Sequence, residues 1–492
     1  MEKHFNELAE LLVNKKIYGD ENVVVTDITA DSRKVVNGSL FIALRGTTVD
    51  GHTYVGKAIQ SGATAILVDT LPDDLPNGIG VIVVPDTREA MEIITPYFFD
   101  YPGKKLRMIG VTGTNGKTTT TNIIYNVLRE AGYGVGLIGT INIVINDTVE
   151  TSHNTTPDVV DLQKTLYHMV QAGCDYCVME VSSHALVLKR VAGIEFDCGV
   201  LTNITQDHLD FHKTMEAYRD AKSLLFEHLA DGKKSNKAAI FNADDESSKV
   251  IEKRTKVNIL TYGKEKNNDI YPICVNIEAK GMNLELATPG GNIRIHTHIT
   301  GLFNVYNLMG AVAVLLVEGV SVSVIEKVLN EFKGVQGRFQ LVEAGQNFTV
   351  IVDYGHTPDG LENVLRTARK ITEKNLWVVF GCGGDRDNTK RPIMGKIALE
   401  LADKIVVTSD NPRSENPETI LDQICVAFQD VKEKEIYRFV DRKEAICFAM
   451  GKAESGDVVL IAGKGHENYQ ILKDKTIHFD DCEVVKEYWS KK

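Results

Sequence analysis

The residue types best suited to phosphate chemistry stand in residues 110–121, which read GVTGTNGKTTTT. Lys117 offers a positive charge to the outer phosphates of a nucleotide, and the hydroxyl of Thr118 is a suitable ligand for Mg²⁺. An apolar run precedes this stretch, and apolar residues at helical spacing follow it over residues 118–130. A helix N-terminus after a glycine turn presents unpaired N–H groups and a dipole that favours anions. The stretch therefore predicts a nucleotide-binding loop.

One position departs from the strict phosphate-loop pattern. That pattern has glycine six residues before the lysine, where this chain has Val111. An ordinary glycine turn between a strand and a helix is the alternative interpretation. The Lys-Thr pair and the flanking strand and helix favour nucleotide binding.

A carboxylate and two histidines follow in the middle of the chain. Glu180 ends a predicted strand, 176–181, where it could bind Mg²⁺ directly or through water; a glutamate facing solvent is the alternative. His208 and His212 are four residues apart and have aspartates beside them, which suits a metal or a phosphate. The pair lacks the glutamate of the HExxH zinc motif, and two histidines alone are more often structural.

Polar loops follow three apolar strands in the last third of the chain. The predicted strands 376–380, 404–408 and 458–462 run into GCGGDR, SDNPRSENP and GKGHE. Arginines suit carboxylates, while Asp and Glu suit an ammonium group, so together these loops fit a zwitterionic amino acid. Each loop alone could be merely polar, but that reading weakens if all three meet at one sheet edge. Arg386 stands where a dinucleotide fingerprint needs glycine, which argues against NAD.

These residues require a particular arrangement of strands and helices. Strands predicted at 176–181, 199–203 and 238–242 alternate with helices, so we expect a mainly parallel sheet that binds ligands at its carboxyl ends. Residues 1–104 also alternate short strands and helices. There, Ser32, Arg33 and Arg45 could hold an anionic ligand, although exposed arginines beside turns are usually only solvated.

The length of 492 residues is too great for one core. We expect three domains: residues 1–104, residues 105–336 with a small antiparallel meander at 271–298, and residues 337–492. Pro102-Gly103 is a natural linker between the first two. The predicted fold class is α/β, with a central phosphate-loop domain built on a parallel sheet.

Composition limits the classes of function. Hydrophobic residues make up 43% and charged residues 25%, as in ordinary globular proteins, and the net charge of −12 argues against a nucleic-acid surface. The longest apolar stretch, 309–317, is too short to span a membrane. Eight cysteines, mostly inside apolar runs, suit buried thiols in a reducing cytoplasm, and we interpret the lone CxxC at Cys174 and Cys177 as core.

With these motifs in view, the chain resembles the Mur ligases, the ATP-dependent amino-acid-adding enzymes of peptidoglycan synthesis. The matching stretches are GTNGKTT at 113–119, EVSSHAL, TNITQDHLDFH, YRDAKSLLF, FNVYN, GRF, VDYGHTPD, GCGGDRD, DNPR and GKGHE, in this order over nearly the whole chain. The resemblance points to the member that adds the third residue to UDP-N-acetylmuramoyl-L-alanyl-D-glutamate through an acyl phosphate. It implies an N-terminal α/β domain for the UDP-substrate, a central ATPase domain and a C-terminal Rossmann-like domain for the amino acid.

The resemblance also implies which residues contact each substrate. Ser32 would contact the uridine part. The residues implied for the sugar-peptide are Asn154, Thr155, Thr156, Ser182 and Arg190. The residues implied for ATP are Gly113, Thr114, Asn115, Gly116, Lys117, Thr118, Thr119, Asn304, Asn307, Arg338 and Asp353. Related enzymes often carry Gln two residues before the arginine at 190, where this chain has Leu188.

Lys222 matches a lysine that the family carbamylates with CO₂ so that it can ligate or orient Mg²⁺. Without the resemblance, this lysine on a helical stretch would be read as solvated surface. The residues expected to do the catalysis are Lys117, Glu180, His208 and Lys222, and those expected around Mg²⁺ are Thr118, Glu180, His208 and carbamylated Lys222.

The motif DNPR resembles that of family members that add meso-diaminopimelate, in which the arginine meets the distal carboxylate. The residues implied for this amino acid are Arg386, Asp410, Asn411, Pro412, Arg413, Gly463 and Glu467. The same ligase with L-lysine as substrate, a folylpolyglutamate-type ligase and a non-catalytic ATP-binding regulatory protein are the alternatives. We expect a cytoplasmic monomer with small-molecule substrates and no nucleic acid or membrane as partner.

Overall fold

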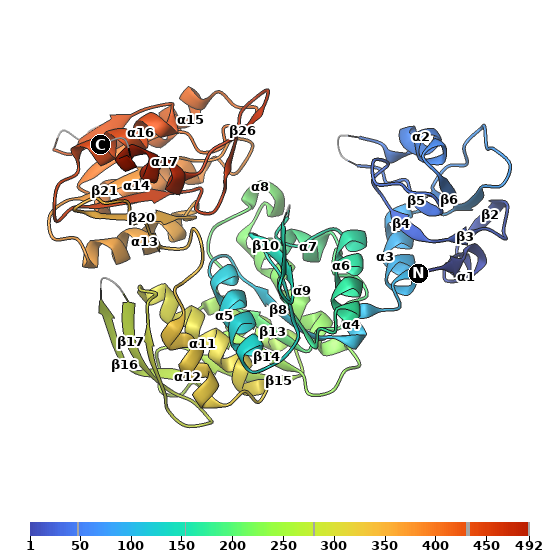
Figure 1. The fold of residues 1–492 in the computed structure, drawn as a ribbon, viewed down its shortest axis with the longest axis horizontal. Helices are drawn as coiled ribbons and strands as arrows, with labels where there is room; N and C mark the ends of the chain where they lie inside the picture. Colours follow the sequence, from blue (N-terminus) through green and yellow to red (C-terminus); the bar gives the residue numbers. More distant parts are fainter. Residues whose placement is uncertain (47–48, 153, 279–280, 430–432, 491–492) are drawn as a thin grey trace. The chain divides into compact units, whose positions relative to one another are not determined.

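The computed structural model describes residues 1–46, 49–152, 154–278, 281–429 and 433–490 (Figure 1). They form two compact units, made of several segments each. The first comprises Met1–Gly110, Gly132–Gly199 and Leu224–Lys237; the second comprises Val111–Ala131, Val200–Ser223 and Ala238–Lys492. The chain passes between the units within strands β8 (Arg107–Thr112) and β13 (Cys198–Leu201).

The first unit opens with a five-stranded sheet in the order β2-β7-β6-β5-β4. Its strands are β2 (Lys16–Gly19), β4 (Asp27–Thr29), β5 (Ser39–Ile42), β6 (Ala63–Val68) and β7 (Gly80–Val83), and all neighbours except β2 run parallel. The stretch of residues 24–29 is not one continuous strand. It is divided into β3 (Val24–Val25), which pairs with β1 (Lys3–His4), and β4, because Thr26 instead bonds the turn at Gly38 through its N–H.

Helices flank this sheet much as the apolar spacing predicts. They are α1 (Phe5–Glu10), α2 (Val55–Gln60) and α3 (Thr87–Phe98). Asp86 caps α3 by accepting from the N–H groups of Arg88 and Glu89. The predicted linker Pro102-Gly103 begins a short helix, α4 (Pro102–Lys105).

The central sheet has eight strands in the order β11-β10-β9-β12-β8-β13-β14-β15. The remaining strands are β9 (Val135–Ile138), β10 (Asn142–Ile145), β11 (Thr148–Thr151), β12 (Tyr176–Glu180), β14 (Ala238–Asn242) and β15 (Asn258–Tyr262). β9 runs parallel to β12 and β14 to β15, as expected, whereas β9, β10 and β11 form an antiparallel meander that the sequence patterns did not reveal. Cys177, one of the two CxxC thiols, is fully buried in β12, and Cys174 just before this strand is also buried, as predicted.

Helices α5 (Lys117–Glu130), α6 (Val159–Gln171), α9 (Met215–Asp231) and α11 (Leu302–Val317) accompany this sheet (Figure 1). The predicted meander is β16 (Tyr271–Glu278), β17 (Gly281–Ala287) and β18 (Ile293–Thr297), and α12 (Val322–Glu331) packs against β18. Lys280, in the turn predicted within this meander, lies outside the described residues. Across the described ranges, no helix is both long and apolar enough to cross a membrane.

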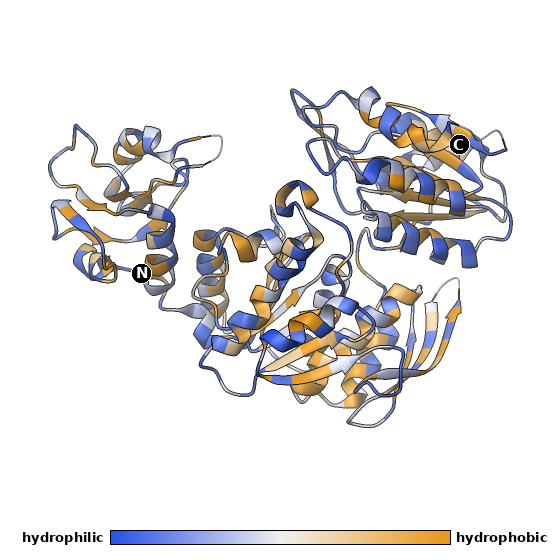
Figure 2. Cartoon of the chain, turned by 180° about the vertical axis from the view of Figure 1, so that it is seen from behind, coloured by the Kyte–Doolittle hydropathy of each residue, from blue (hydrophilic) through white to orange (hydrophobic). Residues whose placement is uncertain are grey.

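The last sheet has six strands in the order β19-β20-β24-β21-β22-β23. They are β19 (Gln340–Leu341), β20 (Thr349–Asp353), β21 (Leu376–Phe380), β22 (Lys404–Val407), β23 (Glu435–Arg438) and β24 (Val458–Ala462), all parallel except β19. Figure 2 shows these strands as apolar, between helices that mix apolar and polar faces. Although β24 comes last in sequence, it lies between β20 and β21, so the polar loops after β24, β21 and β22 are neighbours.

Two apolar cores cover the two faces of this last sheet. One contains side chains of α13 (Pro358–Lys370), α14 (Lys390–Leu401) and α15 (Pro417–Cys425); the other contains those of α16 (Arg442–Lys452) and α17 (Asp481–Ser490). Helix α13 begins at Pro358, and two features fix its start. Thr357 caps it by accepting from the Gly360 N–H, and Pro358 occupies its first turn.

A buried charge network in the first unit gives a stability prediction. The Lys234 ammonium donates to Asp197 (2.7 Å) and to two backbone carbonyls, and Asp197 also accepts from the Met108 N–H at 2.6 Å. Lys234→Met removes one of the two cations that face the buried Asp197 carboxylate, because Arg107 Nη1 still lies 3.1 Å from its other oxygen, so we expect a loss of about 2 kcal/mol in the free energy of opening β8. Hydrogen exchange of the peptide containing Met108 measures this loss. The exposed neighbour variant Lys233→Met is the control, and equal exchange in both variants would contradict the prediction.

Candidate functional site

The predicted phosphate loop has the expected structure. Strand β8 ends at Thr112, and α5 begins at Lys117. Gly113 and Gly116 have φ angles of 144° and 91°, which side-chain-bearing residues rarely adopt. A Cβ on Gly116 would lie 2.2 Å from the Oδ1 atom of Asn307. The turn therefore requires glycine at both positions, and the first N–H groups of α5 lie at its end.

Backbone and side chains that follow β13 hold the loop in place. The Asn115 N–H donates to Oδ1 of Asn203 at 2.9 Å, and Thr202 Oγ1 donates to the Asn115 carbonyl at 2.6 Å. The Thr114 N–H donates to the Asn203 carbonyl at 2.8 Å. The loop is thus fixed by bonds to the neighbouring strand end, while Thr118 and Thr119 are buried in the first turn of α5.

Two lysines converge on one carbonyl oxygen of this loop. Lys117 Nζ donates to the carbonyls of Gly113 and Thr114, both at 2.8 Å, and Lys222 Nζ donates to that of Gly113, also at 2.8 Å. Lys222 is fully buried on α9, so the surface interpretation that its isolated position suggests is wrong. Burial, and secondly the Lys117 charge, hold the pKa of Lys222 well below the usual value. The fraction of molecules in which this amine is neutral is therefore larger than for an ordinary exposed lysine.

The two histidines of the TNITQDHLDFH stretch have different surroundings. His208 has a left-handed backbone (φ 55°) and caps α8 (Leu209–His212); its Nε2 lies 3.3 Å from a carboxylate oxygen of Asp207. His212 is buried against the ring of Tyr218, with centroids 5.1 Å apart. Within the described ranges, no three His, Cys, Asp or Glu side chains cluster as a metal site.

Asp207, one of the aspartates beside the two histidines, is a buried anion. Burial would raise the pKa of its carboxyl, but His208, Lys390 and His356 around it hold that pKa well below the ordinary range. The Lys390 ammonium and His356 Nε2 each lie 3.9 Å from an Asp207 oxygen. The histidine of VDYGHTPD and the lysine after GCGGDRD were both missed, because neither type reveals burial in isolation.

Two asparagines of FNVYN lie at the start of α11. Asn304 Nδ2 donates to the Thr300 carbonyl (2.8 Å), and Asn307 Nδ2 donates to Oδ1 of Asn304 (2.9 Å). Both are buried, and Asn307 adjoins Gly116 of the phosphate loop. The structure therefore brings FNVYN next to the loop.

The GRF and VDYGHTPD stretches are joined by one carboxylate. The oxygens of buried Asp353 accept from the Phe339 and Gly355 N–H groups, both at 2.6 Å, and burial raises the pKa of this carboxyl. The bond to Phe339 fixes the backbone directly after Arg338, whose Nη2 donates to Thr118 Oγ1 at 3.0 Å. Both carboxylate oxygens of Asp353, which is predicted as a nucleotide contact, thus accept hydrogen bonds from backbone N–H groups.

Glu180 in the first unit is almost fully buried, so the solvent-facing alternative is excluded. Its Oε1 accepts from the Thr140 N–H (2.9 Å) and its Oε2 from the Thr140 hydroxyl (3.0 Å). The Thr140 hydroxyl also lies 3.0 Å from that of Thr155. The carboxylate is therefore held in a fixed orientation by one threonine.

Most of the residues predicted for the sugar-peptide lie around this carboxylate. The Thr156 hydroxyl donates to the Glu180 carbonyl (2.9 Å), and the Thr156 carbonyl accepts from Nη1 of Arg190 (3.1 Å). Ser182 caps α7 (Ser183–Val187) and donates its N–H to the Thr156 hydroxyl (3.1 Å). Asn154, which directly precedes Thr155 in the sequence, is exposed.

Ser32 lies in a turn near the N-terminal sheet. The arginines beside it are paired with carboxylates. Arg33 donates to Asp31, while Arg45 donates to Asp50 and Asp69. These pairs offset the charge on which the interpretation of an anion site rested.

The three polar loops of the last sheet meet, as their positions at strand ends predict. Arg413 Nη1 donates to the Gly384 carbonyl (2.8 Å), which joins the second loop to the first. Asn411 Nδ2 donates to a Glu467 oxygen (2.8 Å), which joins the second to the third. A Cβ on Gly463 would lie 2.6 Å from the Asp410 carboxylate. Arg386 is exposed, with Nη1 on the Asp385 carbonyl.

One buried lysine in this cluster was not singled out from the sequence. Lys464 is fully buried, and its ammonium lies 2.7 Å from a Glu467 oxygen. Burial raises the pKa of the Glu467 carboxyl, and Lys464 opposes that rise. Its position between two glycines in GKGHE gave no signal of burial. The cluster thus combines the carboxylates of Asp410 and Glu467, the cations Arg413 and Lys464 and the Asn411 amide at one sheet edge.

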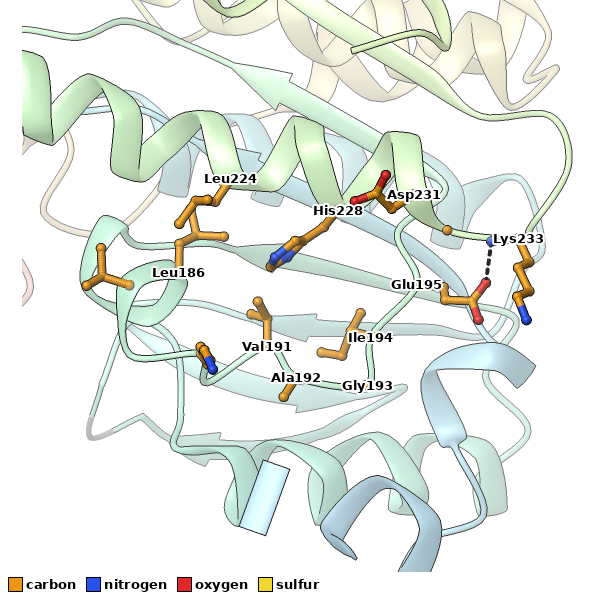
Figure 3. Close-up of a pocket in the computed structure, with 13 residues that line it drawn as sticks. Leu186, Val191, Ala192, Gly193, Ile194, Glu195, Leu224, His228, Asp231 and Lys233 are labelled. Atoms are coloured by element: carbon orange, nitrogen blue, oxygen red, sulfur yellow. Dashed lines mark hydrogen bonds between the residues drawn. The ribbon is translucent and has the colours of Figure 1, made fainter. Parts of the chain in front are cut away.

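A separate pocket of about 510 Å³ lies in the first unit (Figure 3). Leu186, Val191, Ile194 and Leu224 make its apolar wall, and His228 points into it. None of the residues predicted to contact substrate lines it, so we do not assign it to the predicted chemistry.

Family models match three successive segments of the chain. They are described as the Mur ligase family catalytic domain (residues 24–96), the Mur ligase middle domain (residues 111–315) and the Mur ligase glutamate ligase domain (residues 337–465).

Similar proteins extend over nearly the whole chain. The chain is 48% identical, over 95% of both sequences, to UDP-N-acetylmuramoyl-L-alanyl-D-glutamate--2,6-diaminopimelate ligase of Bacillus licheniformis. It is 46% identical to the Bacillus cereus protein of that name, over 98% of this chain and 97% of the other. A solved structure bearing that name is 33% identical, has a TM-score of 0.68, and is matched over 99% of its length by all of this chain.

The buried amine of Lys222 gives a prediction about pH. Its pKa in the folded protein lies below the usual 10.5, so between these two values the unfolded chain binds more protons and stability rises with pH. Lys222→Met removes this term. We expect the variant to melt at a higher temperature than the parent at pH 7 in bicarbonate-free buffer, with the gain shrinking as pH approaches 10.5. Thermal unfolding at several pH values measures this, with exposed Lys253→Met as control. A gain independent of pH would refute the assignment.

Proposed function

The chain belongs to the Mur ligase family, and we propose that it is the ATP-dependent ligase that adds meso-diaminopimelate to UDP-N-acetylmuramoyl-L-alanyl-D-glutamate in peptidoglycan synthesis. The observation that carries this proposal is the meeting of the DNPR, GCGGDRD and GKGHE loops at one sheet edge. The relatives with this name, similar over nearly their whole length, support it.

The reaction makes a poor electrophile reactive and then replaces phosphate by an amine. The D-glutamyl carboxylate attacks the γ-phosphorus of ATP, and ADP leaves, which gives an acyl phosphate. The amine of diaminopimelate attacks the acyl carbon, the tetrahedral intermediate expels phosphate, and the nitrogen loses its proton as the amide forms. Catalysis then consists mainly of placing reactants and offsetting phosphoryl charge.

The ATP contacts that we propose all belong to the second unit. Lys117 offsets charge on the transferred phosphoryl group, and the loop N–H groups bind the other phosphates. Arg338 adds a second positive charge, which its bond to Thr118 supports. The full proposed set is Gly113, Thr114, Asn115, Gly116, Lys117, Thr118, Thr119, Asn304, Asn307, Arg338 and Asp353.

We propose that Lys222 becomes a carbamate, as in its family. The neutral amine attacks the carbon of CO₂, a C–N bond forms and a proton is released. The depressed pKa of Lys222 supports this step because only the neutral amine is a nucleophile. The new anion would also lie close to the Lys117 ammonium, which would stabilise it.

Magnesium is proposed as the metal. The donors offered for it are hard oxygen ligands, the Thr118 hydroxyl, the Glu180 carboxylate and a Lys222 carbamate, with His208 as a nitrogen donor, and this set fits Mg²⁺ through its oxygens. When bound, Mg²⁺ would neutralise charge on the ATP phosphates. We keep Glu180 as a proposed ligand on this chemistry.

The remaining contacts are proposals of the same kind. Those for the UDP-sugar-peptide are Ser32, Asn154, Thr155, Thr156, Ser182 and Arg190. Those for the amino acid are Arg386, Asp410, Asn411, Pro412, Arg413, Gly463 and Glu467. L-lysine has no distal carboxylate and would leave the arginine that binds this group without its carboxylate partner. Such a site would therefore discriminate strongly between the two amino acids.

We further propose that residues 1–104, 105–336 and 337–492 serve the UDP-substrate, ATP and the amino acid respectively. The segments matched by the family models support this division. We propose a cytoplasmic monomer that acts on small molecules.

Phosphate release from ATP tests the proposed function. With UDP-N-acetylmuramoyl-L-Ala-D-Glu, Mg²⁺ and bicarbonate, we expect release with meso-diaminopimelate but not with L-lysine or without amino acid. Lys117→Ala should lower the rate by a factor of about 10³ or more, since it removes a charge that acts in the transition state. Release with lysine instead would overturn the specificity, and release with neither amino acid would favour a non-catalytic ATP-binding protein.

The carbamate can be observed directly. In the presence of ¹³C-bicarbonate, we expect a carbamate ¹³C resonance from the parent protein that Lys222→Ala lacks. Lys253→Ala, which changes an exposed lysine, should retain it. A resonance that persists in Lys222→Ala would exclude this lysine as the site.

A further inference from the structure

Arg391, the second residue of α14, has one of the largest fully buried side chains among the described residues. Its guanidinium makes a bidentate contact with the Glu415 carboxylate: Nη1 donates to Oε2 (2.8 Å) and Nη2 donates to Oε1 (2.9 Å). Nη1 also donates to Gln423 Oε1 (2.6 Å), and Nη2 donates to the Gly383 carbonyl (2.9 Å). This one side chain therefore bonds both the GCGGDRD loop and the segment that follows DNPR.

Glu415 extends the connection to the residue before Arg386. Its Oε1 accepts from the Asp385 N–H at 2.5 Å, and the Asp385 carboxylate in turn accepts from the Ser414 hydroxyl at 2.7 Å. The Arg391 hydrogen bonds hold the pKa of the Glu415 carboxyl below its usual value, so it is an anion at neutral pH. The two loops are thus joined by bonds that converge on one ion pair.

Both loops are held in an uncommon backbone conformation. Asp385 and Arg413 have φ angles of 55° and 53°, the left-handed region that residues with side chains seldom adopt. Gly384 packs so closely that a Cβ would lie 1.9 Å from the Pro412 carbonyl oxygen. Such conformations persist only where surrounding contacts impose them, and they concentrate at functional sites.

We propose that Arg391 and Glu415 form a positioning pair for the incoming amino acid, which sets the separation between the guanidinium groups of Arg386 and Arg413. The inference rests on the proposed function, in which these two arginines receive the substrate carboxylates. The pair does not touch substrate. It fixes the backbone from which both arginines extend, and so it governs recognition of a diacid with a set distance between its ends.

Stability alone is a poor reason for such a pair. Arg391 is fully buried and its charge has lost its hydration, whereas the Glu415 side chain remains 30% exposed. Exchanging ion pairs with such dehydrated charges for apolar side chains of similar volume is often neutral or stabilising. Arg391 Nε is also buried without a hydrogen-bond partner among the described residues. The fork geometry, with two parallel bonds to one carboxylate, instead gives directional precision that lysine cannot reproduce.

The test is steady-state kinetics of the full chain with each substrate varied in turn. We expect Arg391→Lys to raise KM for meso-diaminopimelate about tenfold, since a single ammonium cannot make the bidentate contact. KM for ATP and for the sugar-peptide should stay within about twofold. Glu415→Gln should shift KM in the same direction. Combining Arg391→Met with Glu415→Met should cost no more than the worse single variant, because both act through one pair.

Asp457→Asn is the matched control for general destabilisation. Asp457 is buried at the opposite end of the same sheet, where it accepts from the Trp377 indole N–H at 3.1 Å. It should lower the melting temperature without a selective change in KM for diaminopimelate.

Three results would overturn the inference: an unchanged KM for diaminopimelate in folded Arg391→Lys, an equal rise in all three KM values, or a selective rise in Asp457→Asn. If Arg391→Lys does not fold, Glu415→Gln decides by the same criteria. Absence of diaminopimelate-dependent turnover in the parent would instead refute the proposed function, and this inference with it. The two failures are therefore distinguishable.

Discussion

The Lys117 ammonium and the side-chain nitrogen of Lys222 both donate to the carbonyl oxygen of Gly113, and the electrostatics of the phosphate loop depend on this contact. A proton on the buried Lys222 amine would lose its hydration and lie close to the Lys117 charge, so the pKa of Lys222 is held well below its usual value. An anion beside these two nitrogens would stabilise positive charge on both of them. Triphosphate oxygens are anions of this kind. A protein with a net charge of −12 thus concentrates positive charge at one loop.

The need to hold these charges in place explains why the phosphate loop makes so many contacts with the residues after β13. A Cβ on Gly113 would lie 1.8 Å from Thr202 Oγ1, so the strand end after β13 presses directly on the turn. Asn203 then bonds the loop through both its carbonyl and its side chain. Fixed donors and charges act best when they need no rearrangement as phosphoryl charge develops. The rigidity of the loop is therefore part of its chemistry.

The elements that local pattern defines were predictable, and those that long-range packing defines were not. Apolar runs gave β21, β22 and β24, and the rule that parallel strands end at one edge brought their loops together. Neither periodicity nor composition could show that β24 inserts between β20 and β21. Nor could they separate the buried Lys464 and Arg391 from surface residues, because burial of a long cation depends on partners distant in sequence, such as Glu415. The role of Lys222 came from resemblance alone.

Selectivity among amino acids follows from where strain and charge are placed in the last sheet. Meso-diaminopimelate and L-lysine differ by one carboxylate, and an apolar pocket distinguishes such ligands weakly. An arginine held by its backbone at a set position discriminates better, because the ligand without the carboxylate leaves it unpaired. For this discrimination, the arginine must keep its position when the bound ligand lacks the distal carboxylate. The left-handed backbone of Arg413, its bond to the Gly384 carbonyl and the Arg391–Glu415 pair behind it all resist such movement. Rigidity of the loop, more than the number of contacts, would then separate the two substrates.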